Sequence, residues 1–253
     1  MVGTPTSIVV PCRNEASNII PLIEGIARSM SSTGLFEIIV VDDGSDDGMA
    51  AVLHGARQDW PMLRVLRHDR SGGQSAAIHS GVMAARYDLI CTLDGDGQNP
   101  PEELPRLLAP FLASGSETLG LVAGQRVGRK DTMARRLASR FANSLRSWVL
   151  QDGTRDTGCG LKIFRRDAFL ALPYFDHMHR YLPALFARDG WRIAHVDVTH
   201  RPRGGGRSHY SNLQRGIVGI FDLMGVAWLL RRGKKARPTE VLRRPDAETE
   251  RHP

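Results

Sequence analysis

Residues 37–48 read EIIVVDDGSDDG, and they are the most informative part of the chain for its fold class. Its four apolar residues predict a strand buried on both faces, which ends at the acidic turn that follows. Similar short apolar runs predict further strands at 7–10, 63–66, 88–93, 119–123 and 192–198. The spacing between them predicts helices at 16–31, 47–58, 74–85, 102–113 and 178–189. This alternation predicts a Rossmann-like α/β fold, with a mostly parallel sheet and helices on both of its faces.

Polar side chains follow three of the predicted strands at the point where each strand ends. Pro11, Asn14 and Glu15 follow the first strand, Asp43 follows the second, and the segment 94–98 (DGDGQ) follows the fourth. Parallel α/β sheets bind their ligands beyond the carboxyl ends of the strands. The three clusters together therefore predict one ligand site at this edge of the sheet.

Asp94 and Asp96 are the strongest single signal, because residues two apart in an extended chain point to the same side. Paired carboxylates suit Mg²⁺ or Mn²⁺, and such ions usually also bind substrate phosphates. Gln98 is placed to add a carbonyl oxygen. The alternative is a plain turn, which Asp-Gly and Asn-Pro pairs favour. Asp43 likewise suits a nucleotide base or ribose, whereas capping of the next helix is the alternative for this acidic turn.

The chain has 253 residues and a formal net charge of +7, which favours anionic partners. We find no helix-turn-helix spacing, zinc finger or aromatic RNA-binding strand, so nucleic acid is not an expected partner. The three cysteines are widely spaced, which predicts buried thiols rather than a disulfide framework or a zinc site. The first fifteen residues lead into a strand and do not resemble a signal peptide.

Arginines form a third group of candidates, because the guanidinium fork suits phosphate oxygens. A solvated basic surface is the alternative interpretation. The candidates are Arg126, Arg140, Arg165, Arg166, Arg203 and Arg207.

Residues 216–230 are apolar except for Asp222, and basic residues flank them on both sides. Fifteen residues of helix reach only about 22 Å, short of a bilayer core of about 30 Å. The segment therefore predicts an amphipathic helix that docks on a membrane surface, with a core helix and a membrane span as alternatives. We divide the chain into a catalytic domain at 1–210, this docking helix at 211–235, and a disordered tail at 236–253.

Four motifs together resemble the dolichol-phosphate mannosyltransferase branch of the family 2 glycosyltransferases, which have the GT-A fold. They are Pro11-x-x-Asn14-Glu15, VVDDGSDDG at 40–48, DGDGQNPPE at 94–102 and RPRGGGRSHYS at 201–211. The SRFAN segment at 139–143 adds to the resemblance, which covers residues 5–230. Two departures are His209, where the family usually has Lys, and DTGCGLK at 156–162, where it has a DTSGFR-like motif.

The resemblance implies a role for each matched residue. Pro11, Glu15 and Asp43, with Asn14 of the same motif, would bind the donor nucleotide. Asp94 would touch nucleotide or metal, and Asp96 with Gln98 would hold a divalent ion. Arg126 and Arg140 would meet the acceptor phosphate, and Asp156 would lie near the reacting sugar. Arg203 and Ser208 belong to a loop that would close over the donor diphosphate.

The resemblance further implies an inverting enzyme that moves a mannose-like hexose from a nucleotide sugar to a polyprenyl phosphate. We expect it at the cytoplasmic face of a membrane, as a peripheral protein of the bacterial inner membrane, with a membrane-protein partner or a second copy as further candidates. One alternative is a family 2 transferase acting on a saccharide hydroxyl of an envelope polysaccharide or lipid A. Another is a non-catalytic protein that binds nucleotides or anionic lipid.

Overall fold

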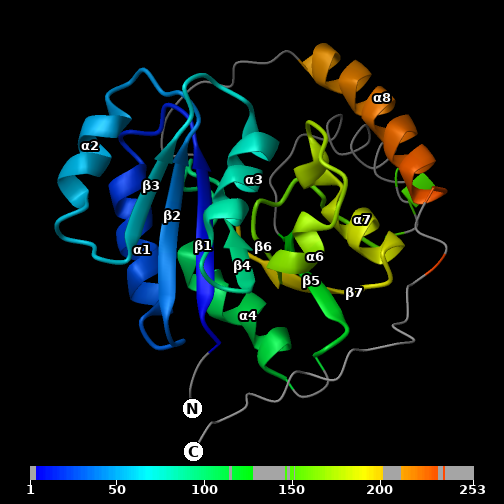
Figure 1. The fold of residues 1–253 in the computed structure, drawn as a ribbon, viewed down its shortest axis with the longest axis horizontal. Coiled ribbons are helices and arrows are strands. Elements are labelled where there is room, and N and C mark those ends of the chain that lie inside the picture. Colours follow the sequence, from blue (N-terminus) through cyan, green and yellow to red (C-terminus); the bar gives the residue numbers. More distant parts are fainter. Residues whose placement is uncertain are drawn as a thin grey trace, which may run out of the picture.

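The computed structural model describes residues 4–113, 116–127, 146, 149–150, 152–201, 212–232 and 236. Within these ranges, seven strands form one sheet in the order β3-β2-β1-β4-β6-β5-β7 (Figure 1). The strands are β1 (Thr6–Cys12), β2 (Phe36–Asp42), β3 (Leu63–Arg67), β4 (Leu89–Thr92), β5 (Leu119–Arg126), β6 (Lys162–Arg165) and β7 (Arg192–Val198). All of the strands predicted from the sequence are present.

The sheet is mostly parallel, as predicted, and β6 is the exception. Strands β1 to β4 pair in parallel, as do β5 and β7, whereas β6 runs antiparallel between β4 and β5. The sequence analysis missed β6, because its four residues follow a polar, glycine-broken segment and carry no alternation of their own. This strand brings Lys162 opposite Thr92 at the end of β4.

Helices cover both faces of the sheet, which explains why the strands are apolar at consecutive positions. They are α1 (Ile19–Met30), α2 (Met49–Ala56), α3 (Gln74–Ala84), η1 (Pro101–Glu103), α4 (Leu104–Leu112), α6 (Arg166–Leu170), η2 (Met178–Arg180), α7 (Leu182–Arg188) and α8 (Asn212–Leu230). In β1, Ile8 and Val10 face the core formed with α1, α2 and α4, whereas Val9 faces the core formed with α3, α6 and α7. The α/β prediction is therefore confirmed.

Helix α3 packs closely on the sheet, since a Cβ on Gly81 would lie 2.4 Å from Cγ1 of Val9. Cys12, Cys91 and Cys159 are buried free thiols.

Helix α8 runs from Asn212 to Leu230, so it contains the apolar segment 216–230 and lies within the predicted docking helix at 211–235. Leu223, Val226 and Leu230 pack on the core beneath α7. A C-terminal helix is thus present, but its amphipathic character is not confirmed, because its outer face also carries exposed apolar side chains. Among the described helices, none combines the length and apolar composition required to cross a bilayer.

Candidate active site

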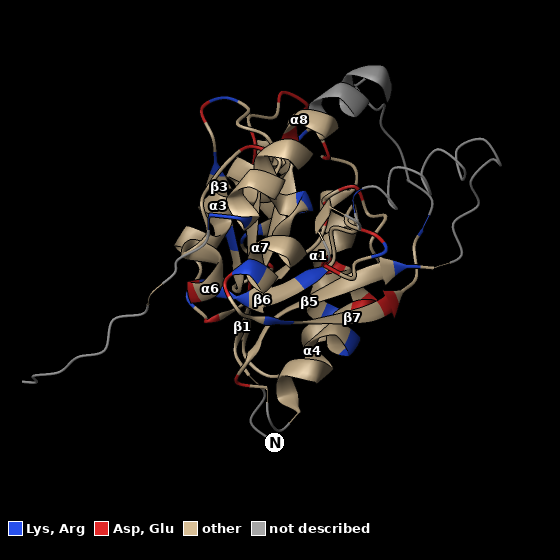
Figure 2. Ribbon diagram, turned by 90° about the vertical axis from the view of Figure 1, so that its right-hand side faces the viewer, with Lys and Arg blue, Asp and Glu red and all other residues tan. Residues whose placement is uncertain are grey.

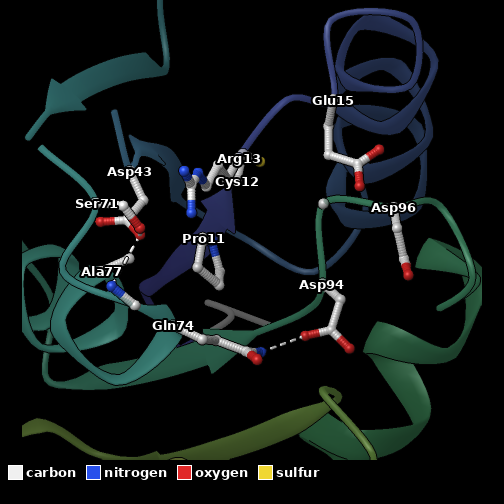
Figure 3. A pocket seen from close by; sticks show the side chains of 12 residues that line it. Pro11, Cys12, Arg13, Glu15, Asp43, Ser71, Gln74, Ala77, Asp94 and Asp96 are labelled. Carbon is white, nitrogen blue, oxygen red and sulfur yellow. Dashed lines mark hydrogen bonds between the residues drawn. The ribbon is translucent and has the colours of Figure 1, made fainter. Parts of the chain in front are cut away.

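The loops that follow β1, β2 and β4 meet at the carboxyl edge of the sheet and surround a pocket of about 330 Å³ (Figure 3). The sequence predicted this meeting of three separate clusters. Among the predicted site residues, those that line the pocket are Pro11, Glu15, Asp43, Asp94 and Asp96. Arg13, Ser71 and Gln74 line it as well.

The Asp43 carboxylate is held by four donors from the chain itself. Its Oδ1 accepts hydrogen bonds from Gly72 N–H (2.8 Å) and lies 2.7 Å from His68 Nδ1, while Oδ2 accepts bonds from Ser71 Oγ (2.7 Å) and Gly73 N–H (2.9 Å). Burial raises the pKa of Asp43, but these hydrogen bonds, led by Gly72, outweigh burial and lower it. Asp43 therefore stays ionised and fixes the loop that carries Ser71 and Gly73 into the pocket.

The loop after β1 contains two predicted donor-binding residues, Asn14 and Glu15, and they make different contacts. Asn14 is exposed, has a φ of 58°, and bridges to the loop after β2. Its N–H donates to Ser45 Oγ (3.0 Å), and its Oδ1 accepts from Asp46 N–H (3.0 Å). Glu15 instead is buried at the pocket wall, where its Oε2 accepts a bond from Asn18 Nδ2 (2.6 Å). Asn14 thus joins two loops that form the pocket, and its contact with a donor stays a prediction.

Asp94 lies at the centre of the site. Its carboxylate accepts hydrogen bonds from Gln74 Nε2 (2.7 Å) and Asn99 Nδ2 (3.2 Å). Burial, followed by the charge of Asp96, raises the pKa of Asp94, although Lys162 and Arg126 oppose this shift. The two carboxylates therefore lie close enough for the charge of Asp96 to raise the pKa of Asp94.

This pair fits a divalent cation, since a cation would relieve the charge that raises the pKa of Asp94. Asp96 lines the same pocket, and its Oδ1 accepts a bond from Gln98 N–H (3.1 Å). The main-chain carbonyl of Gln98 accepts a bond from Arg201 N–H (2.9 Å). No group of three or more His, Cys, Asp or Glu side chains suited to a metal occurs in the described part of the chain. A site with two protein carboxylates is typical of divalent ions that bind mainly through the phosphates of a substrate.

A second pocket of about 330 Å³ adjoins the first, and both are lined by Pro11, Gln74 and Asp94. Lys162, His179 and Arg180 line the second pocket. Lys162 is buried, and burial lowers its pKa although nearby acidic groups oppose the shift. Its ammonium donates to the carbonyl of Cys159. The second pocket is thus richer in basic groups than the first.

Arg126 and Asp156, two predicted catalytic residues, form an ion pair. Arg126 Nε lies 2.5 Å from Asp156 Oδ2, and Nη2 lies 2.9 Å from Oδ1. Burial on its own would lower the pKa of Arg126, but the hydrogen bonds to Asp156 outweigh burial and raise this pKa. Gly158, which lines the second pocket, lies over this pair, because a Cβ there would be 3.0 Å from Arg126 Nη2. Arg126 is therefore oriented by a charged carboxylate beneath the pocket wall.

Four predicted residues lie outside the described residues, namely Arg140, Arg203, Arg207 and Ser208. Conversely, sequence reasoning did not single out Gln74, Lys162 or His179 as site residues. The segment DTGCGLK contained a signal for Lys162, since it ends on a basic residue just before an apolar run. Gln74 and His179 left no such signal, because α3 and η2 bring them to the pockets through tertiary packing.

The fold is that of known sugar transferases. Mannosyl-3-phosphoglycerate synthase from Rubrobacter xylanophilus matches 95% of this chain and 78% of its own with a TM-score of 0.67 at 19% identity. Glucosyl-3-phosphoglycerate synthase from Mycobacterium tuberculosis, in complex with Mn²⁺, UDP and glucosyl-3-phosphoglycerate, matches 92% and 82% with a TM-score of 0.68 at 18% identity. At this identity the likeness shows the fold, and it is the predicted GT-A fold.

The family follows from the sequence. The model of glycosyl transferase family 2 matches residues 7–172, and the chain belongs to this family of glycosyltransferases. It is 37% identical over 240 residues to a dodecaprenyl-phosphate galacturonate synthase from Rhizobium johnstonii, covering 92% of this chain and 68% of the relative. It is 35% identical over 221 residues to an undecaprenyl-phosphate 4-deoxy-4-formamido-L-arabinose transferase from Pectobacterium carotovorum, covering 86% and 66%. The chain thus spans about two thirds of the length of these relatives.

Proposed function

We propose that this chain transfers a sugar, with inversion, from a nucleoside diphosphate sugar to the phosphate of a polyprenyl phosphate. The observation that carries the proposal is the pair of adjoining pockets that share Asp94 and Gln74. One pocket is acidic and suits a cation with the diphosphate of a donor. The other contains Lys162 and Arg180 and suits an anionic acceptor. The named relatives support this acceptor, since both act on a polyprenyl phosphate.

A phosphate acceptor makes a strong general base unnecessary. A phosphate monoester carries close to two negative charges at pH 7, because its second pKa is about 6. One of its oxygens attacks the anomeric carbon while the bond from that carbon to the donor diphosphate breaks, and the leaving nucleoside diphosphate takes the electron pair. The requirement is to bring two anions together, which basic side chains meet by positioning and electrostatics.

The ion pair of Arg126 with Asp156 supports this scheme over transfer to a saccharide hydroxyl. A hydroxyl acceptor needs a carboxylate that takes its proton. Asp156 is the carboxylate that the resemblance places near the reacting sugar, but a carboxylate that accepts two bonds from a guanidinium is a weak base. In our proposal Asp156 orients Arg126, and Arg126 contributes positive charge beside the second pocket.

Asp94 and Asp96, with Gln98, are the residues that would hold Mg²⁺ or Mn²⁺. The ion would neutralise charge on the leaving diphosphate. The glucosyl-3-phosphoglycerate synthase complex, which contains Mn²⁺ and UDP, supports a divalent ion in this fold. Glu15 and Ser71 would line the part of the pocket that takes the donor nucleotide, and Asp43 would hold the Ser71 loop in place.

The sugar is a separate question. The mannose-like hexose implied by the resemblance is not confirmed, and the named relatives use galacturonate and 4-deoxy-4-formamido-L-arabinose. The donor panel should therefore contain UDP-galacturonate and UDP-4-deoxy-4-formamido-L-arabinose beside GDP-mannose and UDP-glucose.

We further propose a peripheral protein at the cytoplasmic face of the bacterial inner membrane. The relatives support the bacterial membrane in this proposal, because both are bacterial and are named for polyprenyl phosphate lipids.

The experiment incubates the chain with each labelled donor, a short polyprenyl phosphate and Mn²⁺ or Mg²⁺, and measures label that moves into organic solvent. Asp96→Asn should abolish transfer, while Asp59→Asn, an exposed acidic residue distant from both pockets, should leave it unchanged. Transfer to a saccharide hydroxyl and not to the lipid would favour the rival enzyme. Full metal-dependent turnover by Asp96→Asn would contradict the proposed metal site.

A further inference from the structure

The outer face of α8 is an exposed apolar stripe made of Ile220, Phe221, Met224 and Trp228. Between 55% and 67% of each of these residues is exposed. Their spacing places them on one side of the helix, within about 100° of arc. Soluble domains rarely leave large apolar side chains contiguous in this way unless another surface covers them.

The opposite face of α8 is already used by the protein. Leu223, Val226 and Leu230 pack on the core, and Asp222 lies 3.0 Å from His177 Nδ1. The single acidic residue of this helix is therefore turned inward and paired. Over the part of α8 whose side chains are described, the exposed stripe carries no negative charge.

Positive charge follows the stripe at the end of the helix. Arg231 and Arg232 are exposed, and the guanidinium of Arg232 lies over the ring of Trp228 at 5.7 Å. The sequence continues with Gly-Lys-Lys-Ala-Arg, so residues 231–237 contain five basic residues and no acidic one. Apolar rings beside a basic cluster complement an anionic lipid surface, because the rings enter the interface while the cations meet the headgroups.

Helix α8 lies close to residues that line the second pocket. Helix α8 is at the end opposite the N-terminus in both views, and β1 runs away from that terminus (Figures 1 and 2). The segment around η2 joins the two regions: His177 contacts Asp222, Tyr181 donates to the Gly219 carbonyl at 3.5 Å, and Arg180 between them lines the second pocket. A surface that covers the stripe would therefore lie beside the basic pocket.

We propose that the α8 stripe docks on an anionic lipid bilayer and so brings the second pocket to the phosphate of a lipid acceptor. The proposal rests on the proposed function, because it names the surface from which that site takes its substrate. A second copy of the chain is the rival occupant, but its stripe would offer no acidic side chain to the basic cluster, whereas an anionic bilayer offers negative headgroups.

The test uses the full chain and a pair of matched double variants. Phe221→Gln with Trp228→Gln removes the two rings of the stripe, and Leu112→Gln with Met83→Gln removes two exposed apolar side chains elsewhere. We measure sedimentation with vesicles of phosphatidylcholine alone and of phosphatidylcholine with phosphatidylglycerol. The stripe variant should lose at least about tenfold in partitioning to anionic vesicles, while the control variant should behave like the wild type.

Two activity assays keep this test separate from the proposed function. Transfer to polyprenyl phosphate embedded in vesicles should fall in the stripe variant, whereas transfer to a water-soluble short prenyl phosphate should not. Loss of both would show that the stripe serves folding, which thermal unfolding would register. Equal vesicle binding by the stripe variant and the wild type would overturn the docking proposal, as would a wild-type dimer that this variant loses. Wild-type failure on every prenyl phosphate would instead refute the proposed function.

Discussion

Replacing Gly160 with alanine adds a methyl group where the structure leaves no room for one. An ideal Cβ at this position would lie 2.4 Å from each of the three carboxyl atoms of Asp94. Ordinary contacts of such atoms are about 3.5–4.0 Å, so the two groups must separate by roughly 1 Å. The main chain cannot easily retreat, because the Gly160 carbonyl accepts a bond from Thr92 Oγ1 (2.8 Å). The Asp94 carboxylate must therefore move and weaken its 2.7 Å bond with Gln74.

A shift of about 1 Å in a positioning group costs on the order of 10²-fold in rate, which corresponds to about 2.7 kcal/mol. We therefore expect Gly160→Ala to lower kcat/KM for the nucleotide sugar by about 10²-fold. Overpacking of this kind destabilises by about 1–3 kcal/mol, so the Tm should fall by several degrees without loss of the fold. Initial rates with a saturating acceptor, together with thermal unfolding, measure both effects.

Gly55→Ala is the matched control, because a Cβ at Gly55 in α2 meets nothing within 4 Å. It should keep wild-type rates and gain up to about 1 kcal/mol of stability, since alanine favours a helix. Wild-type kcat/KM in a folded Gly160→Ala protein would contradict this prediction, because it would mean that the position of Asp94 does not matter to transfer.

Three further changes test other parts of the site. Arg126→Lys keeps the charge but loses the two-bond contact with Asp156, and kcat/KM with polyprenyl phosphate should fall at least about tenfold; unchanged rates would remove Arg126 from the scheme. Lys162→Met should lower kcat about 10²-fold. Because burial lowers the pKa of Lys162, the wild-type rate should fall at alkaline pH as this side chain loses its proton. Lys162→Arg should abolish that fall, since arginine keeps its proton. Asp94→Asn should abolish transfer yet raise the Tm at pH 7 by a few degrees, because it removes a half-buried charge that burial and the charge of Asp96 disfavour. That gain should shrink as the pH falls through the raised pKa of Asp94, and a gain that grew on acidification would contradict this assignment.

The sequence predicted the sheet and the meeting of its three acidic clusters for a simple physical reason. Strands covered on both faces must be apolar at consecutive positions, as residues 38–41 are, so each strand and its end are visible in the chain. The carboxyl ends of parallel strands share one edge, and this rule alone brings Glu15, Asp43 and Asp94 together. Local pattern and simple topology were sufficient for this half of the site.

The other half depended on contacts that sequence spacing does not encode. Strand β6 runs antiparallel and has four residues, so neither its presence nor the burial of Lys162 could be predicted from periodicity. Gln74 and His179 reach the pockets from α3 and η2. These two elements lie about a hundred positions apart in the sequence and are brought together by tertiary packing. The contact between Ser75 Oγ and His179 Nδ1 at 2.8 Å is an example. The same limit applies to Asn14, whose partners lie in the loop after β2.

The charged groups of the site fall into two physical classes, and this division separates scaffold from chemistry. Asp43 and Arg126 have their charged forms stabilised by hydrogen bonds from the chain, so they are satisfied before any ligand arrives. Burial raises the pKa of Asp94 and lowers the pKa of Lys162, so in both groups it favours the neutral form. A ligand that carries both a cation and phosphate groups supplies the missing partner for each of them. The folded chain thus retains two poorly compensated charges at the junction of its pockets, and the free energy that a metal-bound diphosphate recovers there is available for binding it.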